Sequence, residues 1–283
     1  MGLGGPLSLA KPTGKTYKLV ALDVDGTIRS KEHPISDRTR RAIAQVVEAG
    51  AVVTLATGRS YRSAVKQSQE VGVTAPIVSF QGAHLADPAT EEVFWHQPLT
   101  EALTREALDA MRAWSGDVMA YYGHEVYVNK MTPWIEAYGG RNEVVINEVG
   151  DLTKVAEMEP TRLVAVGDPE EVEKLESQLQ GIFDSALHVT RSLPQFCEVL
   201  HPRSGKDKAL EQLCKPLGIG REKVVAFGNG YNDVDMLRWA GLSVAIGGAV
   251  PQALAAADRT APPVEQDGVA QVLEELLAQG MFR

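Results

Sequence analysis

The stretch Tyr17–Ile28, YKLVALDVDGTI, decides the fold expected of this chain. Leu19 to Leu22 form a short, unbroken apolar run, which is typical of a strand buried on both faces of a parallel sheet. Two carboxylates, Asp23 and Asp25, follow directly, and Gly26 then permits a sharp turn. Because ligands of open α/β sheets bind beyond the carboxyl ends of the strands, this pattern predicts a functional site here.

The two carboxylates indicate a divalent cation and a phosphoryl-transfer reaction. Desolvated carboxylates are unfavourable alone, and Mg²⁺ prefers oxygen ligands while keeping substrate phosphate in its shell. Asp23 has the chemistry of a nucleophile that would form an aspartyl-phosphate. Asp25, two residues further along an extended chain, points to the same side as Asp23 and suits an acid and base. The alternative interpretation is a solvated turn, since Asp, Gly and Thr are common turn residues.

Composition limits the class of protein. The 283 residues are 44% hydrophobic and 23% charged, as expected for one large or two moderate globular domains. A formal charge of −9 without a Lys/Arg block argues against nucleic acid or an acidic membrane as partner. With only Cys197 and Cys214, both expected to be buried, no disulfide framework is implied and a cytoplasmic location fits. Residues 1–16 are predicted to be a flexible tail, and no segment is long enough to span a membrane.

The arrangement of buried strand, polar residue and helix start repeats along the chain. The apolar run Ala51 to Ala56 ends in Thr57-Gly58-Arg59, after which a new helix is expected. Backbone N–H groups at a helix start favour an anion, and the Thr57 hydroxyl can donate to a phosphate oxygen. The alternative is that Thr57 caps the helix and Arg59 is solvated. With a third strand expected at Pro76 to Phe80, the alternation predicts a parallel α/β core.

The pattern changes over residues 85–201. Aromatic residues become frequent, and two short strands separated by Gly123-His124 predict a hairpin. Helices are expected at Thr100–Trp114 and Pro169–Leu179, and the aromatic residues are assigned to a hydrophobic core in preference to a ligand cage. We therefore predict an α+β domain at residues 85–201, inserted into a core domain formed by residues 17–84 and 202–283.

The first pattern returns after the insert. Lys206 precedes an amphipathic helix, and a buried strand at Val224 to Phe227 leads into Asn229, Asn232 and Asp233. Lys206 taken alone is best explained as a surface lysine. Together with the earlier strand ends, however, this set supplies a fixed cation and oxygen ligands for Mg²⁺. The sequence has no P-loop, no G-x-S-x-G elbow and no histidine spacing typical of zinc.

These segments resemble a known family. Asp23-Val24-Asp25-Gly26-Thr27, Thr57-Gly58-Arg59, Lys206 and Gly228-x-x-x-Asn232-Asp233 resemble motifs one to four of the haloacid dehalogenase superfamily. Their order and the large insert resemble the Cof-type subfamily with a C2-type cap, and the resemblance covers nearly the whole chain from Tyr17. It implies a Rossmann-like parallel-sheet core, Mg²⁺, an aspartyl-phosphate intermediate and a cap that selects the substrate.

The resemblance also assigns roles to residues. Asp23 would be the nucleophile and a metal ligand, and Asp25 the acid and base, with its backbone carbonyl on the metal. The phosphoryl group and the metal would be held by the remaining motif residues: Thr57, Gly58, Lys206 and Asn232 for phosphate, and Asn229 and Asp233 for the metal. Lys206 would also steady the Asp23 carboxylate.

Two positions depart from the family pattern. Asn229 stands where the family usually has Asp, and Gln81 where it often has Asn. An Asn carbonyl still coordinates a hard cation, but one negative charge is lost and Mg²⁺ affinity should fall. The expected function is a Mg²⁺-dependent phosphatase acting on a small phosphorylated metabolite, specifically a sugar phosphate. A phosphomutase, or a phosphoester-binding module with little turnover, is the alternative, and the oligomeric state is left open.

Overall fold

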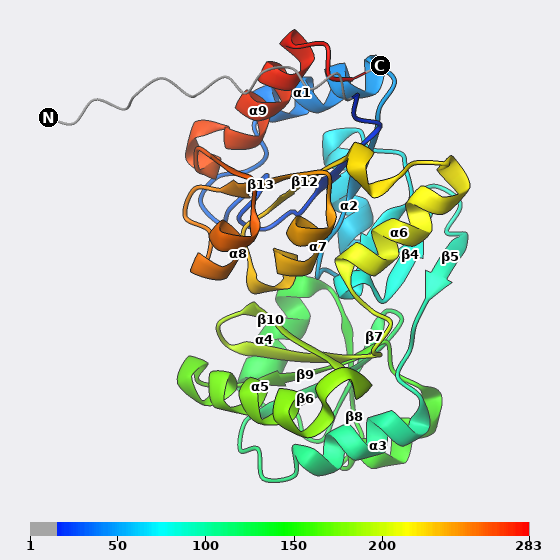
Figure 1. Cartoon of the computed structure of the whole chain (residues 1–283). Helices are drawn as coiled ribbons and strands as arrows, with labels where there is room; N and C mark the ends of the chain where they lie inside the picture. Colours follow the sequence, from blue (N-terminus) through cyan, green and yellow to red (C-terminus); the bar gives the residue numbers. More distant parts are fainter. Residues whose placement is uncertain (1–15, 283) are drawn as a thin grey trace, which may run out of the picture.

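The structure, a computed structural model, describes residues 16–282 and consists of two lobes (Figure 1). The upper lobe in this view holds a parallel sheet with helices on both faces, and the lower lobe holds a mainly antiparallel sheet. The predicted α/β class is therefore confirmed. The tail predicted for residues 1–16 lies outside the described residues except for its last position.

The parallel sheet is built around the strand that opens the chain. Its order is β14-β13-β12-β1-β2, and every neighbouring pair is parallel. The strands are β1 (Leu19–Leu22), β2 (Val52–Leu55), β12 (Val224–Gly228), β13 (Leu242–Ile246) and β14 (Arg259–Ala261). Because β1 lies between β2 and β12, the residues that follow these three strands meet at one edge of the sheet.

Strand β1 buries side chains on both faces, as its unbroken apolar run predicts. Val20 and Leu22 pack in a cluster with residues of α1 (Asp37–Glu48) and α9 (Gly268–Ala278). Leu19 and Ala21 point the other way, toward α6 (Lys206–Leu217). The remaining helices of this lobe are α2 (Tyr61–Val71), α7 (Val234–Trp239) and α8 (Pro251–Ala256). The result is a three-layer lobe with the sheet at its centre.

The six-stranded sheet of the lower lobe has the order β10-β11-β9-β6-β7-β8. Its strands are β6 (Asp117–Tyr122), β7 (Glu125–Val128), β8 (Val145–Glu148), β9 (Arg162–Val166), β10 (His188–Leu193) and β11 (Phe196–Leu200). The hairpin predicted at Gly123-His124 is confirmed by the antiparallel pairing of β6 and β7. Helices α3 (Glu101–Ala110) and α5 (Pro169–Phe183) cover the outer face, while α4 (Pro133–Asn142) lies on the inner face.

The third predicted strand differs from expectation. Strand β3 (Ile77–Ser79) bridges the parallel sheet through the pair Ala56 and Val78, but its main partner is the antiparallel strand β4 (His84–Ala86). The chain turns back through a 3₁₀ turn at Phe80–Gly82, so β3, β4 and β5 (Val93–His96) form a separate sheet. The boundaries of the inserted domain remain a prediction. Strand β4 crosses the boundary that was predicted between residues 84 and 85.

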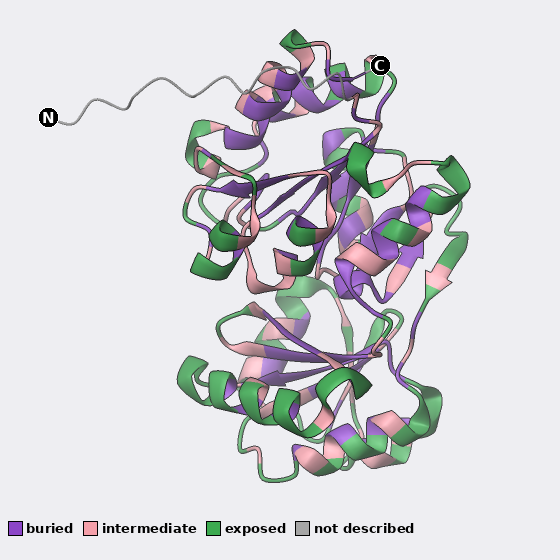
Figure 2. Ribbon diagram, viewed as in Figure 1, coloured by how far each residue is buried: buried purple, intermediate pink, exposed green. Residues whose placement is uncertain are grey.

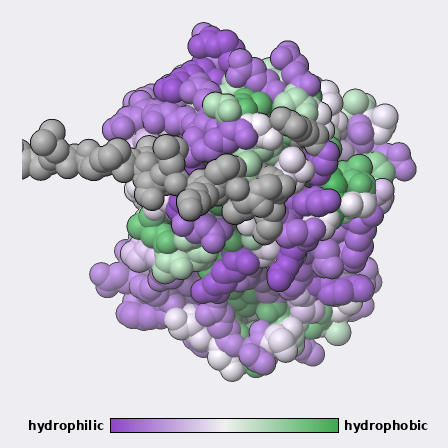
Figure 3. Space-filling view, turned by 45° about the horizontal axis from the view of Figure 1, so that its top comes forward, coloured by the Kyte–Doolittle hydropathy of each residue, from purple (hydrophilic) through white to green (hydrophobic). Residues whose placement is uncertain are grey.

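Burial follows this layered arrangement. In Figure 2 the strands of both sheets are largely buried, whereas the outward faces of the helices are exposed. Cys197 and Cys214 are both buried and free, as predicted. The face seen in Figure 3 is mainly hydrophilic, with smaller hydrophobic areas between the charged side chains. Among the described residues, no helix combines the length and apolarity required to cross a membrane.

Helix α6 offers a test of the packing against β1. Leu210 is fully buried beneath the sheet, whereas Leu217 at the end of the same helix is 47% exposed. We expect Leu210→Ala to lower the free energy of unfolding by about 2–5 kcal/mol, since it leaves a cavity in the core. The matched change Leu217→Ala should cost less than about 0.5 kcal/mol. Urea unfolding followed by circular dichroism measures both, and equal losses would contradict this packing.

Candidate active site

A buried lysine holds two of the predicted site carboxylates together. Lys206 Nζ donates to Asp23 Oδ1 at 2.7 Å and to Asp233 Oδ1 at 2.6 Å. Asp23 and Lys206 are 183 positions apart in the sequence, and the Lys206 side chain is only 1% exposed. Lys206 is thus a buried member of the site, and the surface-lysine interpretation is excluded. The predicted nucleophile, fixed cation and last motif carboxylate lie in direct contact.

Burial and charge compete at this cluster. Burial raises the pKa of the Asp23 carboxyl to about 7, the Asp233 charge adds to this effect, and the Lys206 ammonium opposes it. Burial alone would lower the pKa of Lys206, but Asp23 and Asp233 outweigh it and hold that pKa above its ordinary value. One lysine therefore stays charged between two buried acids.

Asp233 also shapes the loop that follows β12. Its Oδ2 accepts hydrogen bonds from the backbone N–H groups of Asn229 and Gly230, both at 2.8 Å. Because Lys206 occupies Oδ1, every carboxylate oxygen of Asp233 already has a partner. Asp233 thus fixes both the lysine and the loop, and its role as a metal ligand stays a prediction.

Several oxygens converge on the side chain of Asn229. With its amide nitrogen turned toward them, Asn229 donates to Asp25 O at 3.0 Å and to Asp23 Oδ2 at 3.3 Å. The Thr27 hydroxyl accepts a hydrogen bond from the same amide nitrogen at 3.0 Å and donates one to Asp23 Oδ2 at 3.0 Å. The Asp23 carboxylate oxygen and the Asp25 backbone carbonyl oxygen therefore face the same position, which favours a hydrogen-bond donor or a cation.

This donor set fits a magnesium ion. Carboxylate, carbonyl and amide oxygens are the ligands that Mg²⁺ accepts, alongside waters and substrate phosphate. In the described part of the chain, no three Asp, Glu, His or Cys side chains gather as a ligand cluster. The predicted magnesium site does not need three such side chains, because Asp25 would contribute its backbone carbonyl and Asn229 its side-chain carbonyl. Asp23, Asp25 and Asn229 are the residues that would hold the ion.

Glycine is required at the turn between these ligands. Gly26 has φ +84°, a left-handed conformation, and a Cβ atom there would lie 2.2 Å from the side-chain amide of Asn229. Any other residue would therefore strain the backbone and displace Asn229. The D-x-D-G-T turn is a built part of the site, not a solvated loop.

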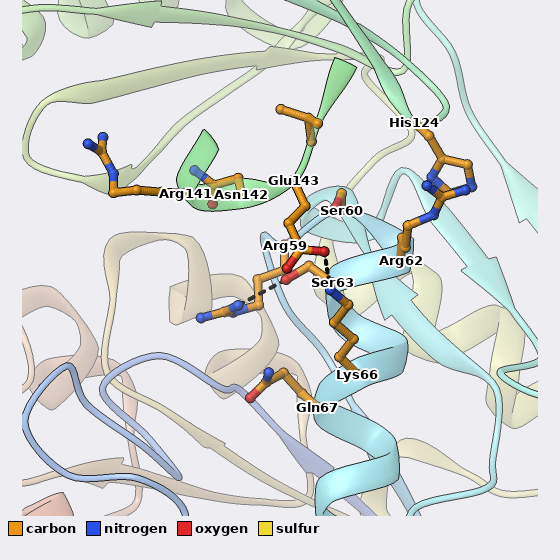
Figure 4. Close-up of a pocket in the computed structure, with 11 residues that line it drawn as sticks. Arg59, Ser60, Arg62, Ser63, Lys66, Gln67, His124, Arg141, Asn142 and Glu143 are labelled. Carbon is orange, nitrogen blue, oxygen red and sulfur yellow. Dashed lines mark hydrogen bonds and ion pairs between the residues drawn. The ribbon is translucent and has the colours of Figure 1, made fainter. Parts of the chain in front are cut away.

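Asp25 is oriented by a bidentate ion pair. Arg59 donates through Nε to Asp25 Oδ2 at 2.6 Å and through Nη2 to Asp25 Oδ1 at 2.7 Å. A third bond, from Arg59 Nη1 to Ser63 Oγ at 2.9 Å, fixes the guanidinium on α2 (Figure 4). Asp25 itself is half exposed and faces the cleft. Arg59, interpreted from sequence as a possible solvated charge, instead orients the predicted acid and base.

The loop after β2 places Thr57 and Gly58 beside these groups. Thr57 is buried, and its Oγ1 accepts the backbone N–H of Arg59 at 3.2 Å. A Cβ atom at Gly58 would lie 2.3 Å from Gln81 Nε2, so a side chain at this position would displace the Gln81 amide. Asn232, predicted to position Lys206 or the phosphate, donates instead to Gln81 Oε1 at 2.9 Å.

These groups open into a cleft of about 680 Å³ between the lobes. Asp23, Asp25, Thr57, Gly58, Asn229 and Asn232 line its core side. Its other side is formed by the lower lobe, which corresponds to the predicted cap, and carries the aromatic residues Tyr121, Trp134, Tyr138 and Phe196. Trp134 stacks on Tyr138 with ring centroids 5.3 Å apart. Trp95 and Tyr127, the other aromatic residues considered from sequence, are not part of this lining.

A smaller pocket of about 160 Å³ adjoins the cleft and shares Arg59, Ser60, Ser63 and Arg141 with it (Figure 4). Its wall is basic, although the whole chain is acidic. Lys66 is paired with Glu143 at 2.6 Å across this pocket. The rim of the cleft thus presents positive charge beside the predicted phosphate site.

Two charged residues of the cleft were not predicted from the sequence. Arg162 and Glu198 line it from the six-stranded sheet, and both are buried. A buried Arg at the start of β9 and a buried Glu in the middle of β11 look in the sequence like solvated charges. Their alternation with the apolar residues of β9 and β11 was the available signal, since it places them on one face of the sheet.

Comparisons with known proteins identify the family of this chain. A family model described as haloacid dehalogenase-like hydrolase matches residues 20–273. A 5-amino-6-(5-phospho-D-ribitylamino)uracil phosphatase of Bacillus subtilis is 29% identical over 263 residues, covering 91% of this chain and 96% of that protein. An HMP-PP phosphatase of Serratia proteamaculans is 26% identical over 247 residues, covering 83% and 86%.

A solved haloacid dehalogenase-like hydrolase from Bacteroides thetaiotaomicron matches the fold. It shares 28% identity with a TM-score of 0.77, covering 92% of this chain and 100% of that one. The family match extends over both lobes and includes every predicted site residue. This chain belongs to the haloacid dehalogenase-like hydrolase family, as the resemblance of its four motifs predicted.

Proposed function

We propose that this protein is a Mg²⁺-dependent phosphatase that hydrolyses a small phosphorylated metabolite through an aspartyl-phosphate intermediate. The observation that carries the proposal is the buried contact of Lys206 with both Asp23 and Asp233 at the floor of the cleft. It holds a carboxylate nucleophile in place beside a permanent positive charge. Phosphoryl transfer depends mainly on such positioning and charge neutralisation.

The residues divide the reaction between them. A carboxylate oxygen of Asp23 attacks the phosphorus, forming an O–P bond as the ester O–P bond breaks. Asp25, held by Arg59, protonates the leaving oxygen and later takes a proton from the water that attacks the aspartyl-phosphate. Thr57, Gly58 and Lys206 hold the phosphoryl oxygens. Bound Mg²⁺ would supply positive charge to the same oxygens.

The cleft supports a small, partly apolar substrate such as a sugar phosphate. Its volume of about 680 Å³ suits a metabolite, and the aromatic residues of the cap offer faces for a sugar or heterocyclic ring. The two relatives named above are phosphatases of small phosphorylated compounds by name. Arg141, which lines both the cleft and the smaller pocket, carries a positive charge that suits an anionic ligand.

The alternative activities differ in what they release. A phosphomutase would require a bisphosphate activator and return a phosphorylated product, whereas a phosphatase releases inorganic phosphate from the substrate alone. A binding module would retain phosphate recognition without turnover. The nucleophile and the acid and base both line one cleft, and the buried lysine contacts the nucleophile, which favours the phosphatase.

The nucleophile is tested by Asp23→Asn with p-nitrophenyl phosphate as substrate. We expect a loss of at least about 10³-fold in kcat, because the amide cannot attack phosphorus. Phosphate release measured without any bisphosphate separates a phosphatase from a phosphomutase. A wild-type enzyme as inert as the variant, across a panel of phosphorylated metabolites, would refute the proposed function.

The metal site is tested by Asn229→Asp. The added charge should lower the half-saturating Mg²⁺ concentration about tenfold, a difference of roughly 1.4 kcal/mol. Without Mg²⁺ the variant should melt at a lower temperature than wild type, because it loses the amide donor to Asp25 O and adds a like charge beside Asp23.

Calorimetric titration with Mg²⁺ and thermal melting with and without the ion measure these two effects. Asn147→Asp, the same change on β8 in the lower lobe, is the matched control and should leave the affinity unchanged. Equal Mg²⁺ affinities of Asn229→Asp and wild type would count against Asn229 as a ligand.

A further inference from the structure

A buried ion pair on the lower lobe faces the upper one. Arg162 Nη1 lies 2.5 Å from Glu198 Oε2, and the two side chains are only 7% and 2% exposed. They stand on the neighbouring strands β9 and β11. The alternate residues of these strands, such as Leu163 and Val199, belong to the core beneath α3 and α5, so the pair projects from the opposite face.

This pair contacts the upper lobe at two points. Arg162 Nη1 donates to the backbone carbonyl of Gly58 at 2.7 Å. Glu198 Oε1 accepts from Gln81 Nε2 at 2.8 Å, and Gln81 Oε1 in turn accepts from Asn232 Nδ2 at 2.9 Å. A continuous series of hydrogen bonds therefore runs from Gly58 through the cap residues to Asn232. Both ends of this series are predicted phosphate-binding residues.

The surroundings make these bonds strong. The Arg162 guanidinium lies 4.3 Å from the ring centroid of Tyr121 and 5.1 Å from that of Phe80. These rings belong to a hydrophobic cluster that joins residues of both lobes. Arg162 Nε is buried without a hydrogen-bond partner, but the bonds of Arg162 with Gly58 and Glu198 are formed away from water, and the loss of either partner would leave a further uncompensated buried group.

The segment that receives these bonds has an unusual backbone. Phe80 and Gln81 have φ values of +48° and +57°, in the left-handed region that residues other than glycine rarely adopt. Such conformations persist where the surrounding structure supports them. Support comes from the Gln81 side chain, which is held by Glu198 on one side and Asn232 on the other.

We infer that Arg162 and Glu198 are positioning residues that set the phosphate-binding loop when the cap lies against the core. They reach the substrate site only through Gly58, Gln81 and Asn232, so they act by placement. The inference rests on the proposed function, because it assigns Gly58 and Asn232 to the phosphoryl group. It makes docking of the cap and assembly of the phosphate site one event.

Adhesion of the lobes alone would not require this arrangement. Well-packed apolar residues of similar volume serve adhesion at least as well as a buried ion pair. What the polar series adds is direction, since each donor and acceptor fixes the orientation of a group beside the phosphate site.

The test compares Glu198→Gln and Gln81→Leu, singly and together, with p-nitrophenyl phosphate. Glu198→Gln keeps the shape and removes the charge, and Gln81→Leu cuts the link to Asn232 while leaving the ion pair intact. We expect each to lower kcat/KM about 10–100-fold, because small misplacements of binding groups have effects of this size. The double variant should lose little more activity than the more damaging of the two single variants, since both changes break the same series.

Glu275→Gln is the matched control, because it breaks the ion pair with Arg259 on the core surface. It should leave kcat/KM unchanged, and its effect on melting temperature should be additive with that of Gln81→Leu. If Glu198→Gln does not fold, Gln81→Leu alone decides. Full activity of Gln81→Leu, or multiplicative losses in the double variant, would overturn the inference.

A separate readout distinguishes failure of the inference from failure of the proposed function. If wild type hydrolyses no phosphate ester, the proposed function fails, and calorimetric binding of inorganic phosphate replaces the kinetics. An increase of about tenfold in the phosphate Kd of Glu198→Gln and of Gln81→Leu would then support the positioning role. Unchanged affinity in both variants would refute it.

Discussion

The Lys206 ammonium, held between the carboxylates of Asp23 and Asp233, is the interaction on which the rest of this site depends. It joins the first strand of the chain to segments that follow nearly two hundred residues later. Without the lysine, two buried acids would repel each other at the edge of the sheet. Because Asp233 also accepts the N–H groups of Asn229 and Gly230, the same charge balance fixes the loop that completes the proposed metal site.

The parts of the fold and site that the sequence predicted share a local signal. Strand β1 has an unbroken apolar run, and the position of functional groups after parallel strands follows from a general property of α/β sheets. Arg162 and Glu198 belong to no such motif, and their alternation with apolar residues indicates a face of the sheet but not their contacts with Gly58 and Gln81. The predicted residues belong to motifs of several polar residues after a buried strand, whereas each missed residue is a single charge in an otherwise apolar strand.

Helix α4 shows a second reason for a missed element. It contains Gly139 and Gly140, which lower helix propensity, and it was not predicted. Its start nevertheless carries the expected signals: Thr132 accepts the N–H of Ile135 at 3.2 Å, and Pro133 occupies the first turn. Packing of Ile135 against the inner face of the six-stranded sheet stabilises a helix that propensity alone disfavours.

The balance of charges in the site suggests a second effect of Asn229, in addition to the weaker metal binding proposed above. Asp23, Asp25 and Asp233 face Lys206 and Arg59, so three carboxylates oppose two cations. An aspartate at position 229 would increase the excess negative charge that an incoming phosphoryl group must approach. Asparagine keeps an oxygen that can reach the ion while reducing this repulsion. If the proposed function holds, asparagine at this position would shift part of the recognition of phosphate from the ion to Lys206, Thr57 and the N–H groups of the surrounding loops.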